Sequence, residues 1–121
     1  MKVAIIGSRT YNNYIEFKML LNKCTIDNDI TITSIISGGA LGVDSLAERY
    51  AKENHIDVNV IKPDYGKYKD CEKRQAPLDR NKLIADKCDI MIAFIQNNST
   101  GSIHATTCAK KLNKIVHRFN V

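Results

Sequence analysis

The chain has 121 residues, a formal net charge of +5 and an ordinary hydrophobic content of 44%. No apolar run approaches the roughly 18 residues of a membrane span, and the first residues lack the basic, apolar and small-residue order of a signal peptide. We therefore expect a cytoplasmic protein with no membrane partner. The length suits one domain over residues 1–121, because no linker or repeat divides it.

The four cysteines give no sign of a metal site. Cys24, Cys71, Cys88 and Cys108 are widely spaced, with no Cys-x-x-Cys pair and no Cys/His cluster at ligand spacing. Most fall on the apolar side of helical patterns, where a free thiol behaves as a small hydrophobe. We expect buried thiols, no metal and no cofactor.

The first half of the chain alternates between strand and helix patterns. Short, continuously apolar runs are typical of strands buried on both faces. Apolar residues spaced three and four apart indicate helices with one face inward. These patterns predict a strand at residues 2–6, a helix at 14–24, a strand at 31–36 and a helix at 43–54.

The second half continues the alternation after a long interruption. A polar loop at residues 63–78 follows a third strand, and loops of this length are usually functional. Asp79 is the predicted N-cap of the helix after the loop. The sequence predicts strands at 58–61, 90–95 and 114–118, helices at 80–87 and 102–112, and a turn at 97–101.

This alternation predicts a Rossmann-like α/β fold with three layers, α/β/α. Helical crossovers between strands favour a mostly parallel five-stranded sheet, for which we expect the order 3-2-1-4-5. In such sheets, ligands bind above the carboxyl ends of the strands, near the point where the strand order reverses. That point lies between the first and fourth strands. The loops at residues 7–10, 37–44 and 96–102 should therefore form one crevice.

The candidate site residues lie in these loops and at the start of the third helix. Backbone N–H groups where a strand turns into a helix suit a phosphate or another anion. The glycines have an alternative explanation, since they also permit tight turns and close helix–strand packing. The predicted ligand-binding set is Gly7, Ser8, Arg9, Ser37, Gly38, Gly39, Ala40, Gly42, Asp44, Arg80, Asn81, Ser99, Gly101 and Ser102.

Each polar candidate has a ligand role and a structural alternative. Arg9 is expected to hold a phosphate bidentately, or else to be a surface arginine. Asp44 or Ser37 would bond a ribose, or else cap a turn or helix. Tyr65 and Tyr68 would stack on a base or pack within the long loop. His104 is expected to face solvent, and no nucleophilic triad is present.

Positive charge gathers in the middle of the chain. A solvated surface explains it better than a nucleic-acid interface, because acidic residues are interspersed. The basic residues are Lys62, Lys67, Lys69, Lys73, Arg74, Arg80 and Lys82.

A set of short motifs, taken in order, resembles the SLOG superfamily, above all its small single-domain YspA/YpsA-related members. The resemblance covers nearly the whole chain. It implies a Rossmann-like fold that binds nucleotides or nucleotide-derived ligands, often as signals. The motifs are Gly7-Ser8-Arg9, Ser37-Gly38-Gly39-Ala40-x-Gly42-Val43-Asp44-x-Leu46-Ala47, Pro63-Asp64-Tyr65, Arg80-Asn81 and Ser99-Thr100-Gly101-Ser102.

The superfamily also includes the lonely-guy phosphoribohydrolases, and the chain departs from their motif. Matching Gly101-Ser102 to their Gly-Thr puts Ala105 where they carry a catalytic glutamate. Asn97-Asn98-Ser99 stands in place of their Pro-Gly-Gly. The sequence therefore favours nucleotide binding over nucleotide cleavage, and Asp44 is the only candidate catalytic residue if the protein is an enzyme.

Three functions remain open from the sequence. The leading hypothesis is a nucleotide-binding or sensing module, and the second is an N-glycosidase acting on nucleoside monophosphates or NAD-like nucleotides. The third is single-stranded DNA binding, as in the related DNA-processing protein A family, which shares the Ser-Gly-x-Ala-x-Gly turn. Nucleic acid is the less favoured partner, and a homodimer is expected by analogy with other Rossmann-like domains.

Overall fold

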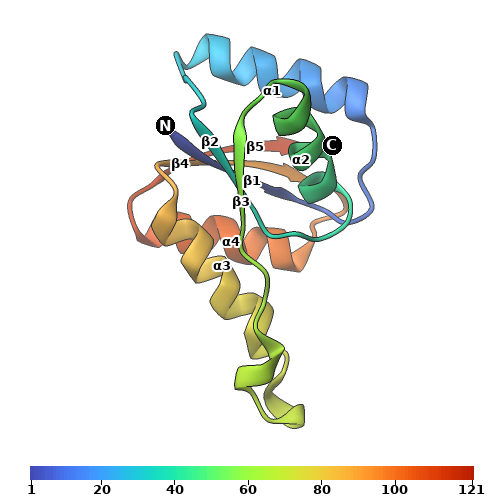
Figure 1. Cartoon of the computed structure of the whole chain (residues 1–121), viewed down its shortest axis with the longest axis vertical. Coiled ribbons are helices and arrows are strands. Elements are labelled where there is room, and N and C mark those ends of the chain that lie inside the picture. Colours follow the sequence, from blue (N-terminus) through green and yellow to red (C-terminus); the bar gives the residue numbers. More distant parts are fainter.

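The computed structural model describes residues 1–121 and contains one five-stranded sheet (Figure 1). All strand pairs are parallel, and the order is β3-β2-β1-β4-β5. The predicted Rossmann-like fold and strand order are thus confirmed. The strands are β1 (Lys2–Gly7), β2 (Ser34–Ser37), β3 (Asp57–Val60), β4 (Ile90–Ile95) and β5 (Ile115–Asn120); the α-helices are α1 (Tyr14–Asp27), α2 (Val43–Glu53), α3 (Gln75–Lys87) and α4 (Thr100–Lys111).

Helices cover both faces of the sheet. Figure 1 shows α1 and α2 on one side and α3 and α4 on the other. Each side has its own apolar cluster, and every residue of β4 is buried. On the α1 side, Phe17 packs against Phe94 with ring centroids 4.7 Å apart. The central strands β1, β2 and β4 are therefore buried on both faces, as a parallel sheet covered by helices requires, whereas the edge strands β3 and β5 are partly exposed.

The start of α3 differs from its predicted position. The helix begins at Gln75, so Asp79 is an internal residue and its predicted role as N-cap is wrong. Pro77 occupies the first turn, where a missing N–H costs nothing because those N–H groups have no acceptor within the helix. The Asp79 carboxylate instead accepts hydrogen bonds from the Tyr68 hydroxyl and the Gln75 amide.

The second strand is also shorter than predicted, because it begins at Ser34 rather than at residue 31. The backbone N–H of Thr33 donates to the carbonyl oxygen of Met1, and the Thr33 hydroxyl bonds the same oxygen. Thr33 is thus tied to the start of β1 before regular pairing begins. Residues 31–33 are a connection with apolar members rather than a strand.

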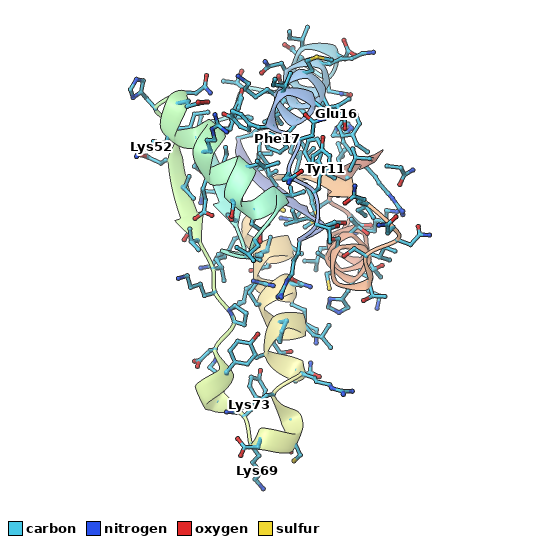
Figure 2. The ribbon with its side chains drawn as sticks, turned by 90° about the vertical axis from the view of Figure 1, so that its right-hand side faces the viewer. Tyr11, Glu16, Phe17, Lys52, Lys69 and Lys73 are labelled. Carbon is cyan, nitrogen blue, oxygen red and sulfur yellow. The ribbon has the colours of Figure 1, made fainter.

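Residues 63–74 form a projecting segment that extends away from the sheet (Figure 1). The segment contains two short 3-10 helices, Tyr65–Lys67 and Asp70–Glu72. Lys69 and Lys73 lie near its outer end (Figure 2). The bond between Tyr68 and Asp79 fastens the segment to α3. The predicted long loop is therefore partly structured.

Gly7 is the last residue of β1 and lies against the backbone of β4 and the Val43 side chain of α2. A Cβ atom at this position would lie 2.2 Å from the Phe94 carbonyl oxygen and 2.6 Å from Val43 Cγ2. Both distances are well below van der Waals contact. Because glycine has no side chain, α2 and β4 can approach the end of β1 closely.

We predict that Gly7→Ala lowers the free energy of unfolding by about 3 kcal/mol or more, because the added methyl group overpacks against backbone. Urea denaturation measures this loss. Gly66→Ala is the matched control, since its Cβ would have only the Asp64 carboxylate, at 3.4 Å, as a neighbour. Equal stability of the two variants would contradict the packing account.

Candidate functional site

A cleft of about 490 Å³ lies at the carboxyl end of the sheet. It is lined by the loop after β1, the loop after β2, the first half of α3, and the connection from β4 into α4. Among the residues predicted from the sequence, Gly7, Ser8, Arg9, Gly38, Ala40, Asp44, Arg80, Asn81, Ser99, Gly101 and Ser102 line the cleft, whereas Ser37, Gly39 and Gly42 do not.

Ser8 joins the three segments that meet at the floor of the cleft. Its backbone N–H donates to the Phe94 carbonyl oxygen at 3.1 Å, and its own carbonyl oxygen accepts from the N–H of Val43 at 3.2 Å. Its hydroxyl donates to the carbonyl oxygen of Gln96 and accepts from the Gln96 N–H. Ser8 is 2% exposed, so its polar groups serve the connection between β1, β4 and α2.

Two backbone donors of the loop after β2 find acceptors within the loop and the first turn of α2. The N–H of Gly39 donates to the Ser37 hydroxyl at 3.2 Å, and the N–H of Ala40 donates to Oδ2 of Asp44 at 3.1 Å. Gly42 has a φ of +74°, and a Cβ there would lie 2.3 Å from the Ser8 carbonyl oxygen. This loop is therefore held by internal bonds and by close packing against the β1 loop.

Arg80 and Asn81 connect the three walls of the cleft. Nη1 of Arg80 donates to the Gly38 carbonyl oxygen at 2.7 Å, and its Nε donates to Oδ1 of Asn81 at 3.0 Å. Nδ2 of Asn81 lies 3.2 Å from both the Gly101 carbonyl oxygen and Nδ1 of His104. The chain of bonds runs from the β2 loop across α3 to the first turn of α4.

The first turn of α4 leaves its donors free. The N–H of Ile103 donates to the Ser99 carbonyl oxygen, whereas the N–H groups of Thr100, Gly101 and Ser102 have no acceptor in the protein. Such groups, together with the helix dipole, make a positive end that attracts anions. The preceding Asn97 has a φ of +55°, a conformation that costs energy in any residue except glycine.

Gly101 has no packing reason to be glycine. A Cβ atom there would meet no atom within 4 Å beyond its own neighbours and its own helix, and glycine within a helix costs up to about 1 kcal/mol relative to alanine. The residue is exposed and lines the cleft. The absent side chain leaves open space at the cleft beside the N-terminus of α4.

The cleft combines one buried carboxyl group with two arginines. Asp44 is 6% exposed, and burial raises its pKa to about 6, although the Ala40 N–H, Arg80 and Arg9 oppose the rise. Burial lowers the pKa of Arg80, while Asp44 opposes that shift. The Arg9 side chain is exposed and makes no hydrogen bond or ion pair. Its charge is therefore available at the cleft.

Several lining residues are missing from the predicted set. Thr10, Gln96, Asn97 and Thr100 line the cleft, and Thr10 donates to the side-chain oxygen of Gln96 at 2.6 Å. All four fall in loops that the sequence predicted as walls of the crevice. Pro77 and Leu78 also line the cleft, because α3 begins earlier than predicted, and their place there had no signal in the sequence.

His104 differs from its expected place. The sequence predicted a solvent-facing side chain, but the imidazole is half-buried, bonded to Asn81, and within 3.7 Å of the Cys108 thiol. Tyr65 and Tyr68 are in the projecting segment and do not line the cleft. No group of three or more His, Cys, Asp or Glu side chains is arranged to hold a metal ion. No helix is both long and apolar enough to cross a membrane.

Comparison with known proteins identifies the family. The model of the YspA, cpYpsA-related SLOG family matches residues 1–68, more than half of the chain. The chain belongs to this SLOG family. No curated protein sequence matches it significantly.

Two solved structures resemble this SLOG chain. One is DNA processing protein A from Helicobacter pylori, determined for its single-stranded DNA binding mode, with a TM-score of 0.69 and 23% identity over 98% of this chain. The other is DNA processing protein A from Streptococcus pneumoniae, with a TM-score of 0.70 and 21% identity over 97% of this chain. The SLOG chain spans 64% and 49% of their lengths. At these identities the likeness shows the shared fold.

The structure locates the residue at which the SLOG chain departs from the lonely-guy motif. Ala105 lies on α4, is 2% exposed and lines the cleft. A methyl group therefore faces the cleft at the position where the resemblance places a glutamate. Asp44 is left as the buried carboxyl group of the lining.

We predict that Asp44→Asn stabilises the ligand-free protein at pH 7.5 relative to wild type. The pKa of Asp44 rises from 3.8 to about 6 on folding, so the stability from its protonated form is complete below pH 3.8 and is lost as the pH rises through 6. Asparagine keeps an acceptor for the Ala40 N–H but never ionises. The gain over wild type should grow between pH 4 and 7.5, to about 3 kcal/mol at most.

Denaturant unfolding of both proteins at several pH values measures this difference. The contributions of the other titrating groups cancel in the stability difference, because both proteins contain those groups. A stability difference that does not change with pH would show that the folded protein does not shift the ionisation of Asp44.

Proposed function

We propose that this SLOG protein binds a nucleotide or a nucleotide-derived ligand in the cleft and acts as a binding or sensing module, with residues 1–121 working as one domain. The observation that carries the proposal is the first turn of α4. Three N–H groups without acceptors face a cleft that also contains the unpaired guanidinium of Arg9. Backbone N–H groups at a helix start and an arginine fork are the donors that phosphate prefers.

The phosphate is proposed to lie at the N-terminus of α4. The N–H groups of Thr100, Gly101 and Ser102 would donate to its oxygens, while Arg9 would approach from the loop after β1. This places the anion away from the loop after β2, whose Gly39 and Ala40 N–H groups are already bonded. The glycine-rich β2 loop would then shape the cleft rather than bind phosphate.

The sugar is proposed to lie over Asp44. Oδ2 of Asp44 accepts from the Ala40 N–H, and Oδ1 makes no bond within the protein. A ribose hydroxyl would donate to this oxygen, because an ionised carboxylate only accepts hydrogen bonds. A phosphate beside Asp44 would be repelled, so the two groups fix the direction of the nucleotide. The cleft volume falls in the usual range for small-molecule sites.

An N-glycosidase is the second candidate, and Asp44 is the observation that favours it. A buried carboxyl group with a raised pKa in a cleft is a common feature of catalytic sites. Asp44 would stabilise the positive charge that develops on the ribose as the glycosidic bond breaks. Ala105 provides no second carboxylate, which is why binding without cleavage is the preferred proposal. Base release from nucleoside monophosphates tests the alternative, and turnover that survives in Asp44→Asn would exclude this mechanism.

Single-stranded DNA is the third candidate. The fold likeness to DNA processing protein A and the lysines of the projecting segment support it. Binding through phosphates weakens steeply with salt, because bound counterions are released. Affinity for a short oligonucleotide that is absent, or unchanged between 50 and 200 mM salt, would exclude this function. A homodimer remains an expectation from analogy, and sedimentation measures it.

Calorimetric titration tests the leading proposal. The panel contains AMP, ADP-ribose, NAD and cyclic nucleotides, and at least one should bind with a dissociation constant below the millimolar range. Adenosine is the matched control, because it lacks the phosphate that the α4 N–H groups would bind. Failure of the whole panel would overturn the proposal.

We predict opposite effects of Gly101→Ala on stability and on binding. The free energy of unfolding should rise by about 0.5–1 kcal/mol, because alanine favours the helix. Affinity for the nucleotide bound best should fall at least tenfold, because a methyl group would enter the space in front of the N–H groups. A stabilised variant with unchanged affinity would place the phosphate elsewhere.

A further inference from the structure

We propose that His104 is a positioning residue for the cleft: its unprotonated Nδ1 holds the Asn81 amide, and Asn81 in turn holds the Arg80 guanidinium. His104 does not line the cleft, whereas Asn81 and Arg80 do. Asn81 is 6% exposed, so its polar atoms depend on partners within the protein. The imidazole is one of those partners.

The neighbours of Asn81 fix the direction of its amide group. Nε of Arg80 can only donate, so the atom 3.0 Å from it must be the amide oxygen of Asn81. The Gly101 carbonyl oxygen can only accept, so the atom 3.2 Å from it must be the amide nitrogen. Two independent contacts therefore give the same orientation.

This orientation determines the tautomer of His104. Nδ1 of His104 lies 3.2 Å from the amide nitrogen of Asn81, which only donates. Nδ1 must therefore carry a lone pair, and the proton of the neutral ring is on Nε2. Protonation of the ring would put a hydrogen on Nδ1, and two donors would then face each other.

The surroundings of His104 favour the neutral ring. Burial lowers its pKa, as do the positive charges of Lys82 on α3 and Lys111 on α4. The Cys108 thiol lies 3.7 Å from Nε2 and 3.8 Å from Nδ1, and the Arg80 charge lies beyond Asn81. No carboxylate is among the causes of its pKa shift. These causes all lower the pKa of His104, so the ring is neutral at pH 7.5 and takes up a proton only in more acidic solution.

Protonation of His104 should also weaken the contact between Arg80 and the β2 loop. Loss of the acceptor at Nδ1 frees one hydrogen of the Asn81 amide in a buried place. Rotation of that amide would relieve the clash but would present a nitrogen to Nε of Arg80. The guanidinium that donates to the Gly38 carbonyl oxygen would then lose its second anchor. The cleft should therefore loosen at low pH.

Nitrogen NMR of the ligand-free protein tests the proposal without any ligand. At pH 7.5, His104 should show a protonated Nε2 and an unprotonated Nδ1. Lowering the pH to 5 should shift the side-chain resonances of Asn81 and of Arg80 Nε in step with His104. A proton on Nδ1 at pH 7.5, or Arg80 and Asn81 resonances that do not follow His104, would overturn it.

His104→Asn is the matched variant, because its Oδ1 can replace Nδ1 as an acceptor but does not titrate in this range. The Asn81 resonances of this variant should stay constant between pH 7.5 and 5, and the Arg80 resonances should follow only the titration of Asp44, whose carboxyl group acts on Arg80 in both proteins. His104→Leu removes the acceptor and should show the low-pH pattern at both pH values. Identical pH profiles of wild type and His104→Asn would overturn the proposal.

The binding experiment rests on the proposed function and uses AMP as the probe. The affinity ratio between His104→Asn and wild type should be near one at pH 7.5 and about fivefold or more in favour of the variant at a pH where the NMR titration shows His104 to be protonated. The titrations of Asp44 and of the phosphate affect both proteins equally, so their effects on affinity cancel in this ratio. A ratio that stays at one would overturn the positioning role, whereas absence of AMP binding in both proteins would count against the proposed AMP site and leave the NMR test standing.

Discussion

The geometry of the site depends on the bonds made by one buried residue, Ser8. Its backbone and hydroxyl bind the ends of β1 and β4 and the first residue of α2. These segments meet at the point where the strand order reverses, which is where an open α/β sheet leaves a crevice. Gly7 and Gly42 permit the contact, because a side chain at either position would strike backbone. These bonds and close contacts are present without a ligand, and such preorganisation reduces the cost of binding.

The two helix starts at the cleft have different chemistry. At the start of α2 the Asp44 carboxylate occupies the first turn and accepts from the Ala40 N–H, whereas the first turn of α4 has free N–H groups and no acidic residue. Arg80 and Asn81 span the distance between them and hold both loops at a fixed separation. A ligand with an anion at one end and hydroxyl groups at the other complements this arrangement. The methyl group of Ala105 leaves the α4 side without a carboxylate, which is why we propose binding of the ligand in preference to its cleavage.

The fold was predictable because its signals are local, and most of the site followed from the fold. Apolar runs and helical spacing gave the strands, their order, and the loops that would converge. The start of α3 was missed because Pro77 is equally compatible with a loop and with a first helical turn. The bond between Ser8 and Gln96 joins residues 88 positions apart, and neither residue type predicts such a bond. The contact of His104 with Asn81, 23 positions away on another helix, likewise had no signal in the sequence.

We propose that the phosphate binds to the free N–H groups of α4 and not to those of the β2 loop. Backbone amide NMR during titration with AMP, compared with titration by adenosine, tests it most directly. The account predicts large shifts at Thr100, Gly101 and Ser102 that adenosine does not produce, while the amides of Gly39 and Ala40 keep their internal bonds and move little. Phosphate-dependent shifts confined to Gly39 and Ala40 would contradict the account.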